Sequence, residues 1–393
     1  MGSRQTAVGP WPSLPTAYCL LGEAMRILTI DVGTGTQDIL LFDADQELEN
    51  CVKMVMPSPT AVVARQIRAA TERGTPLLLD GVTMGGGPSH WAAMDHVRAG
   101  HPVYATPDAA RTFDDDLDGV AEMGISVVSE DEAAALSGAE RVTLRDLWVD
   151  EVRTALRAFG ADDRFDALAV AVFDHGAAPP GYSDRIFRFD YLAERVRQSA
   201  DLTVFSFMRE AIPESLTRLR AVAGSVDRSY PLLVMDTAPA AVLGALEDPA
   251  VAERSASIVA NVGNFHCLAF RLEAGRIAGL FEHHTGELSQ GELEAFLEKL
   301  IDGTITNQEV FDDMGHGALM FQPPGRLEDA FLAITGPRRG LLKGSPLRPY
   351  LAVPHGDMML AGCFGLLRAY AAHDPRVAEA VTSRLGARPG AST

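Results

Sequence analysis

Short apolar runs that end in polar turns recur along the chain and predict β-strands. The first run, Ile27 to Ile30, ends at Asp31 and is followed by a turn containing Gly33 and Gly35. A second apolar run then covers 39–42. The pattern continues as strands near 26–31, 38–43 and 50–55, a helix over 60–73, a strand at 76–80, a helix from about 88 and a short strand at 102–104.

The second part of the chain repeats this order of elements. Its pattern predicts strands near 256–262, 265–271 and 275–281, a helix over 289–302, strands near 330–334 and 349–353, and a helix over 356–372. A β-meander followed by alternating helices and strands, present twice, predicts a duplicated α/β architecture with mixed sheets.

The region between the repeats also reads as α/β. We expect a helix over 144–158, strands at 167–173 and 232–235, and a helix over 238–246. Residues 105–143 are acidic and irregular, and the run Asp114, Asp115 and Asp116 reads as a solvated face, with a metal site as the alternative.

A chain of 393 residues exceeds the usual size of a single core, so two domains are expected. Their boundary falls around 230–250. We expect a disordered extension at 1–24, a first domain with insertions at 25–240, a second domain at 241–375 and a disordered tail at 376–393.

Charge and cysteine content exclude several classes of protein. The formal net charge of −19 disfavours a nucleic acid or an anionic membrane surface as partner. The chain has no apolar run of the length that a membrane helix needs. Its four cysteines are scattered and form no CxxC pair, which is typical of reduced thiols in a cytoplasmic protein.

The turn after Asp31 carries groups that suit a phosphate. A strand–turn–strand of this kind directs backbone N–H groups and the hydroxyls of Thr34 and Thr36 into one concavity. Asp31 at the strand end can hold Mg²⁺ through water. The alternative is a plain hairpin with a glycine-rich turn.

Two later segments have comparable features. Asn261, Gly263 and Asn264 stand in the second meander where Asp31 and its turn stand in the first, although Asn261 supplies neither charge nor a general base. The alternative is a polar turn between strands. Near the C-terminus, Gly356 and Asp357 precede a small-residue helix that Asp357 can cap.

These features, in this order, resemble the superfamily of acetate and sugar kinases, Hsp70 and actin over nearly all of 25–373. The resemblance implies two actin-like (ribonuclease H-like) α/β domains with a cleft between them, and ATP and Mg²⁺ as cofactors. It assigns the first phosphate motif to Asp31, Gly33, Thr34, Gly35 and Thr36, the second to Asn261, Gly263 and Asn264, and the surroundings of adenosine to Gly336, Gly356 and Asp357.

Within that superfamily, 261–266 and 281–288 are similar to a little-characterised bacterial and archaeal branch. Its members are often labelled pyruvate formate-lyase activating proteins, a label that implies radical-SAM chemistry. The chain has no CxxxCxxC iron–sulfur motif, so we set this label aside.

Two aspartates are candidates for the general base that accepts a substrate's proton. Asp80 ends an apolar strand and precedes the glycine-rich segment 81–90, and Asp174 ends another before His175 and Gly176. The alternative for each is a flexible connection between a strand and a helix.

Histidines form a second pattern. Six of them lie beside glycines or in a pair at predicted strand ends: His175, His266, His283, His284, His316 and His355. We expect at least three to face one cavity, with His283 and His284 pointing to opposite faces of a strand so that only one can join. Candidate ligands for a divalent metal, including one besides Mg²⁺, are Asp31, His175, His266, His284 and His355.

The sequence therefore predicts a Mg-ATP-binding protein that transfers a phosphoryl group to a small-molecule acceptor. One alternative is an ATP-dependent switch that activates a protein partner. The other is a metal-dependent enzyme that uses the histidines and has lost nucleotide binding.

Overall fold

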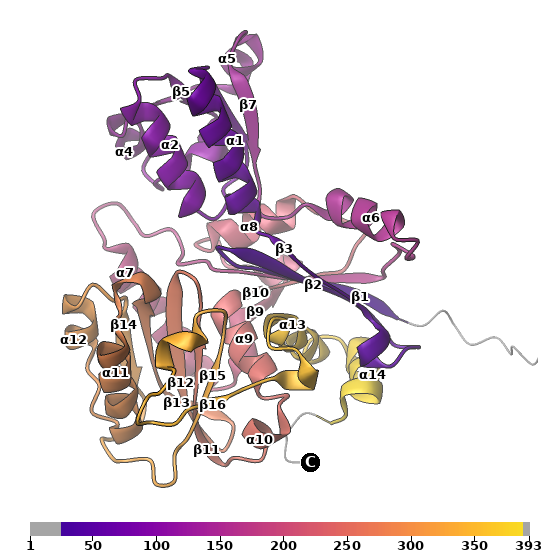
Figure 1. The fold of residues 1–393 in the computed structure, drawn as a ribbon, viewed down its shortest axis with the longest axis vertical. Helices are drawn as coiled ribbons and strands as arrows, with labels where there is room; N and C mark the ends of the chain where they lie inside the picture. The colour runs from indigo at the N-terminus through magenta and orange to yellow at the C-terminus, as the bar shows by residue number, and fades with distance from the viewer. Residues whose placement is uncertain (1–24, 388–393) are drawn as a thin grey trace, which may run out of the picture.

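The computed structural model describes residues 25–387, which form three β-sheets (Figure 1). The first sheet has the order β3-β2-β1-β8-β10-β9. Strands β1 to β3 form an antiparallel meander, and β8 and β10 run parallel to β1. The strands are β1 (Arg26–Val32), β2 (Thr36–Asp43), β3 (Val52–Pro57), β8 (Ala167–Val172), β9 (Ser206–Met208) and β10 (Leu232–Asp236).

The second sheet repeats this topology in the order β14-β13-β12-β11-β15-β16. Its strands are β11 (Ala256–Val262), β12 (His266–Glu273), β13 (Arg276–His284), β14 (Gly317–Met320), β15 (Phe331–Thr335) and β16 (Tyr350–Leu351). The first hairpins also match, because the N–H of Gly33 donates to Thr36 O at 2.9 Å and that of Gly263 to His266 O at 3.0 Å. In each large sheet, the first strand of an antiparallel meander pairs with a parallel strand. Because this arrangement occurs in both sheets, it confirms the expected actin-like (ribonuclease H-like) fold.

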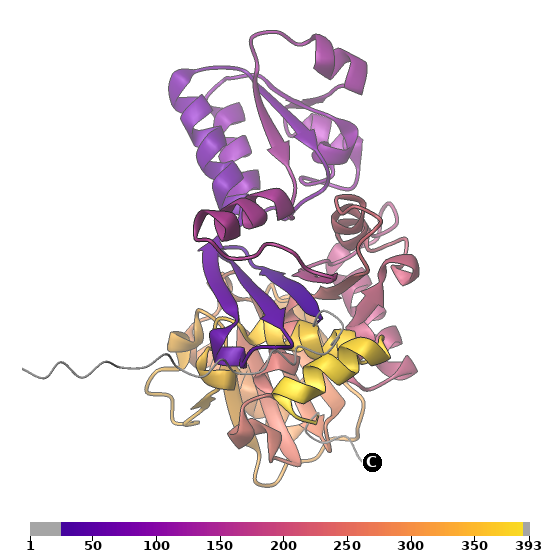
Figure 2. The same cartoon turned by 90° about the vertical axis from the view of Figure 1, so that its right-hand side faces the viewer.

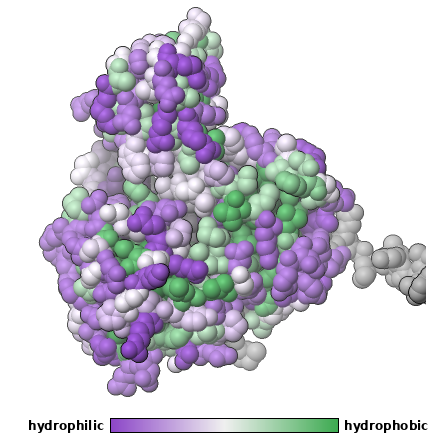
Figure 3. Space-filling view, in the orientation of Figure 1, coloured by the Kyte–Doolittle hydropathy of each residue, from purple (hydrophilic) through white to green (hydrophobic). Residues whose placement is uncertain are grey.

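A third, four-stranded sheet is inserted between β3 and β8. Its parallel strands β4 (Leu77–Gly81), β5 (Val103–Ala105), β6 (Ile125–Val127) and β7 (Glu140–Leu144) pair in the order β6-β5-β4-β7. We call residues 58–146 the inserted domain. Figures 1 and 2 show it standing above the other two sheets, and Figure 3 shows a largely hydrophilic lobe on a narrow neck.

The expectation of irregular structure over 105–143 was wrong. This region contains α3 (Pro107–Ala110), α4 (Leu117–Glu122), β6, α5 (Glu130–Ala135) and most of β7. These elements are short, and β7 buries only alternate residues, Val142 and Leu144, so its apolar signal is weak. The acidic run itself is mostly exposed, as expected for Asp114 and Asp116.

Two helices lie between the large sheets and contact each other closely. Helix α9 (Thr237–Ala245) packs on strands of both sheets, and α13 (Ala361–Ala371) packs on β1, β2 and β8. A Cβ on Gly244 would overlap Ala361 O, and one on Gly365 would overlap Ala240 O. Glycine at these positions therefore allows the two backbones to touch, and residues of both sheets share one apolar core around the helices.

The remaining helices pack on the sheets or on the core that the two large sheets share. They are α1 (Pro59–Arg73), α2 (Pro88–Arg98), α6 (Val149–Ala158), α7 (Asp184–Gln198), α8 (Thr217–Gly224), α10 (Pro249–Ala252), α11 (Gln290–Asp302), α12 (Asn307–Asp312) and α14 (Pro375–Leu385). None of the helices within 25–387 has both the length and the apolar character needed to cross a bilayer.

Helix α14 corrects the prediction that the chain is disordered from 376 onward. Val377 and Val381 are buried one helical turn apart, so the helix docks on the core around α13. The expected extension at 1–24 and the final residues 388–393 lie outside the described part of the chain.

Candidate functional site

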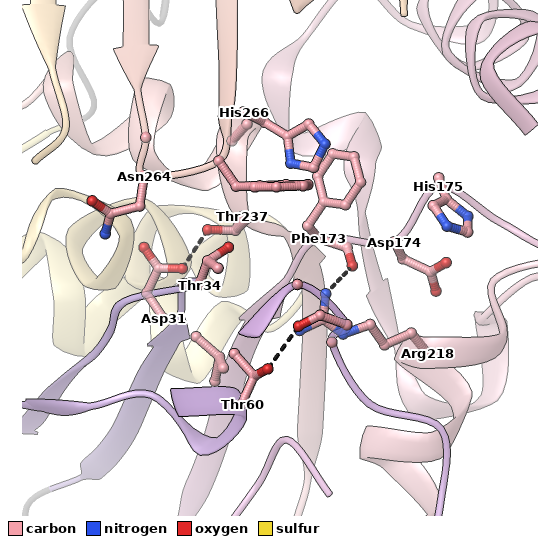
Figure 4. A pocket seen from close by; sticks show the side chains of 18 of the residues that line it. Asp31, Thr34, Thr60, Phe173, Asp174, His175, Arg218, Thr237, Asn264 and His266 are labelled. Carbon is pink, nitrogen blue, oxygen red and sulfur yellow. Dashed lines mark hydrogen bonds between the residues drawn. The ribbon is translucent and has the colours of Figure 1, made fainter. Parts of the chain in front are cut away.

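A cavity of about 460 Å³ lies where the two large sheets and the inserted domain meet (Figure 4). This volume is in the range of small-molecule sites. Of the residues predicted for the site, it is lined by Asp31, Gly33, Thr34, Thr36, Asp174, His175, Asn261, Gly263, Asn264, His266, His284 and Gly336. The two sheets and α9 contribute most of this lining, and the inserted domain adds Thr83 to Gly87, Arg111 to Phe113 and Asp115.

The two glycine turns face each other across this cavity, as the repeat predicted. Gly35 itself does not line the cavity, but a Cβ built on it would lie 2.5 Å from Asn264 Nδ2. Any side chain at Gly35 would therefore displace Asn264. The turns from opposite domains thus present their backbone N–H groups and polar side chains to one volume.

Asp31 is held between the two central helices. Thr237 at the start of α9 donates its hydroxyl hydrogen to Asp31 Oδ1 at 2.5 Å (Figure 4). On the other side, a Cβ on Gly362 of α13 would overlap Asp31 Oδ2. Only glycine lets that helix approach the carboxylate.

Asp38 lies directly opposite Asp31 in the β1–β2 ladder, and both side chains are buried. Burial raises the pKa of Asp31 to about 7. The hydrogen bond from Thr237 lowers this pKa, and the nearby Asp236 carboxylate raises it. Burial and the Asp31 charge raise the pKa of Asp38 to about 8. Asp38 Oδ1 has no hydrogen-bond partner among the described residues, so this pair lacks a compensating cation.

The end of the cavity around Gly336 is more apolar. Gly336 has a φ of 96°, and a Cβ there would lie 2.5 Å from Asn261 Oδ1, so the position requires glycine on two grounds. The walls nearby come from α9, from the turn after β15 and from the segment before α13: Ala238, Ala241, Pro337, Met358 and Met359.

Gly356 and Asp357 lie outside the cavity, contrary to expectation. Asp357 accepts a hydrogen bond from the Met359 N–H at 3.0 Å and so positions a residue that does line the cavity. It does not cap α13, because that helix begins four residues later, after Leu360.

Asp80 is not at the site. It belongs to β4 in the separate sheet of the inserted domain, where its Oδ2 pairs with the Arg141 guanidinium at 2.6 Å. The sequence showed an aspartate at a strand end but not which sheet contained that strand. The prediction of Asp80 as a base in the cavity is therefore wrong.

Asp174 lines the cavity, but both of its oxygens already accept hydrogen bonds. Gly176 N–H donates to Oδ1 and Leu219 N–H to Oδ2, each at 2.9 Å. Burial raises the pKa of Asp174, which the two backbone donors partly offset. These contacts favour a role in holding the 174–176 turn against α8.

Two residues at the site, Arg218 and Asp115, had no sequence motif to reveal them. Arg218 donates to both oxygens of buried Asp146, at 2.6 and 2.9 Å. It also donates to Phe173 O at 2.6 Å (Figure 4). Asp115 of the inserted domain also lines the cavity, and burial raises its pKa. Within the acidic run the sequence could not distinguish Asp115 from its exposed neighbours.

Four of the six singled-out histidines line the cavity: His175, His266, His284 and His316. This confirms the expected convergence. His283 points away, as alternation along β13 requires, and its Nε2 contacts Asp313 O at 2.7 Å. His355 is also elsewhere, with its Nε2 3.4 Å from Glu247 Oε2 and its ring against Phe364, so its assignment as a metal ligand beside the others is wrong.

Comparison with known families gives one match, to a family described as "Putative pyruvate format-lyase activating enzyme (DUF1786)", over residues 84–341. No curated protein matches the chain.

Several solved structures are similar to the chain at low identity. The ethanolamine utilization protein EutJ from Carboxydothermus hydrogenoformans is 12% identical, with a TM-score of 0.33 and coverage of 91% of each chain. An exopolyphosphatase from Cytophaga hutchinsonii is 10% identical (TM-score 0.27), covering 79% of this chain and 66% of that one.

A ROK family transcriptional regulator, a homolog of the E. coli MLC protein, is 10% identical (TM-score 0.26). The match covers 65% of this chain but 38% of the regulator, so the chain spans under two thirds of that protein's length. Because all of these TM-scores are below 0.5, the fold assignment rests on the strand order and hairpin register of the two sheets.

Proposed function

We propose that this chain, which belongs to the DUF1786 family, binds Mg-ATP in the cavity and transfers the γ-phosphoryl group to a small molecule. The observation that carries the proposal is the meeting of the two glycine turns at Gly35 and Asn264. Their N–H groups and hydroxyls suit phosphate oxygens. The apolar end, with Met358 and Met359, suits a nucleobase.

The buried carboxylates of Asp31 and Asp38 suit the Mg²⁺ ion that accompanies the nucleotide. Their raised pKa values and the unpaired Oδ1 of Asp38 reflect negative charge without a partner, which a hard divalent cation would compensate. Mg²⁺ would hold the phosphates and neutralise charge that develops on them. Thr237 fixes the orientation of the Asp31 carboxylate for this task.

We assign Asp115 as the general base that takes the proton from the acceptor. Asp80 lies outside the cavity, and both oxygens of Asp174 are occupied. Asp115 is half-buried on the wall formed by the inserted domain, and its raised pKa suits a general base. Trp91 of the same domain packs against Phe265 beside the second turn, with ring centroids 5.8 Å apart, and so connects the inserted domain with that turn.

A second candidate function is an ATP-dependent switch that activates a protein partner. Asn261 favours it, because an amide at this position of the second turn has no charge and cannot act as a base for hydrolysis. Such a protein would bind ATP with slow turnover and would not need an acceptor.

Calorimetric titration of the full chain with ATP, with and without Mg²⁺, tests the shared part of both proposals. We expect Mg²⁺-dependent binding to wild type and to Asp45→Asn, a control at an exposed turn residue, and its loss in Asp31→Asn. Unchanged binding in Asp31→Asn would remove Asp31 from the site. Label transfer from γ-³²P-ATP to small acceptors distinguishes a phosphotransferase from a slow switch, which would bind ATP without transfer.

A further inference from the structure

Three imidazoles gather at one edge of the second sheet. His266 begins β12 and His284 ends β13, and the two are cross-strand partners in the ladder. His316 immediately precedes β14, where its N–H donates to Glu282 O at 2.9 Å. Each ring offers a nitrogen, and these nitrogens all lie within 4.8 Å of one another. His266 directly follows the second glycine turn, and all three histidines line the cavity.

The cluster has buried polar atoms with no partner. His316 is 5% exposed, and its Nε2 has no hydrogen-bond partner among the described residues. His284 Nδ1 is likewise buried and unsatisfied. Buried polar groups in proteins are normally hydrogen-bonded, so two unpaired nitrogens in one cluster indicate a ligand that completes them.

The three rings lie close together in the wall of the cavity. Their centroids are 5.0 Å apart for His266 and His284, 5.1 Å for His266 and His316, and 4.7 Å for His284 and His316. Neutral imidazoles have a free lone pair on each ring, which metal coordination requires.

Neighbouring groups also orient the rings. Glu282 Oε1 lies 3.0 Å from His316 Nδ1, while Arg188 holds Glu282 Oε2 at 3.0 Å. In metal sites a carboxylate commonly lies next to the ring nitrogen of a histidine that does not bind the metal, and it orients the ring. Glu282 has this position at His316 Nδ1, which leaves His316 Nε2 for the metal ion. His266 stacks on Phe173 with centroids 4.0 Å apart and planes 10° apart, as Figure 4 shows.

We propose that His266, His284 and His316 bind one divalent transition-metal ion with an open coordination position toward the cavity. Imidazole nitrogens suit Zn²⁺ and its transition-metal neighbours, whereas Mg²⁺ requires oxygen ligands, so this site is distinct from the Asp31 and Asp38 pair. Three protein ligands are typical of zinc sites that keep a position for water or substrate. The open position takes an oxygen of the acceptor or a water molecule.

The test uses the full chain after chelator treatment and titration with Co²⁺, followed by metal analysis. Wild type is expected to bind one equivalent with visible d–d absorption that Zn²⁺ abolishes and excess Mg²⁺ does not. His284→Gln and His316→Gln should bind at least tenfold more weakly. His175→Gln is the matched control, because His175 lines the same cavity but is exposed and lies outside the cluster.

Thermal unfolding with and without Zn²⁺ gives a second readout that does not require activity. Zn²⁺ should raise the melting temperature of wild type and His175→Gln and leave that of His284→Gln unchanged. Failure of wild type to retain stoichiometric Co²⁺, or an equal Zn²⁺ effect in all three proteins, would overturn the proposal. Metal binding is measured without nucleotide, so this result is independent of the test for ATP binding.

Discussion

Arg188 and Glu282 form a buried ion pair that joins the two halves of the molecule. Arg188 on α7 of the first domain and Glu282 on β13 of the second are both inaccessible to solvent, with guanidinium NH2 3.0 Å from Oε2. The same guanidinium pairs with Asp236 and donates to Asp174 O at 3.0 Å. The Arg188 side chain therefore links the end of β10, the 174–176 turn and the Glu282 carboxylate next to His316.

Removing this guanidinium should be costly. Arg188→Ala leaves Asp236 and Glu282 buried without a cation, and breaking a buried pair in this way typically costs about 3–5 kcal/mol. Urea unfolding followed by circular dichroism measures the change. The control Arg98→Ala removes an exposed pair with Asp95 and should cost under about 1 kcal/mol. Similar losses in the two variants would contradict the structural role given to Arg188.

Gly362→Ala should damage the nucleotide site without touching a charged residue. The added methyl would overlap Asp31 Oδ2, so Asp31 must leave its position beside Thr237. We expect at least tenfold weaker Mg-ATP binding by calorimetry and a loss of about 1–3 kcal/mol in stability. In Gly291→Ala no described atom lies within 4 Å of the new methyl, so this control should retain both properties. Full Mg-ATP affinity in Gly362→Ala would refute the predicted contact.

The Asp31 and Asp38 pair should make stability depend on pH. Their pKa values are raised to about 7 and about 8, so the folded protein holds protons that the unfolded chain has released above about pH 4. Stability from this pair is therefore greatest at low pH and is lost as the pH rises from about 4 to about 8. Urea unfolding in chelator across this range should show a shallower decline for Asp31→Asn than for wild type. Parallel curves would show that Asp31 titrates normally.

Mg²⁺ should reverse that loss, because it binds the deprotonated carboxylates. Its stabilising effect on wild type should be larger at about pH 8.5 than at about pH 5.5. Melting curves at the two values measure this, with Asp31→Asn as the control that should respond weakly at both. An equal Mg²⁺ effect at the two values would place the cation elsewhere.

The purified protein should be colourless despite the name of its family. Within the described part of the chain, Cys51, Cys267 and Cys363 are free and buried on separate elements, in the loop before β3, on β12 and on α13. Anaerobic reconstitution with iron and sulfide should give no charge-transfer absorbance. A stoichiometric cluster would restore the activating-enzyme chemistry that the cysteine spacing argues against.

The local pattern of the chain was enough to predict both meanders and both glycine turns. Apolar runs within 27–43 and 258–267 set the strands, and glycine sets the turns, because these preferences act over a few residues. Duplication of the order indicated an α/β architecture with mixed sheets, and the resemblance of the motifs to the actin superfamily implied the actin-like fold. The elements of the inserted domain were missed where they were too short to show a period.

Convergence of the site depended on the tertiary structure. Asp80 and Asp31 both end apolar strands, yet only Asp31 reaches the cavity, because their strands belong to different sheets. By itself the sequence determined that histidines lie at strand ends and that only one of His283 and His284 could join the others. The pairing of β12, β13 and β14 decided which histidines come together in the cluster. Contacts between residues far apart in the chain arise from sheet pairing and domain packing, which no local pattern encodes.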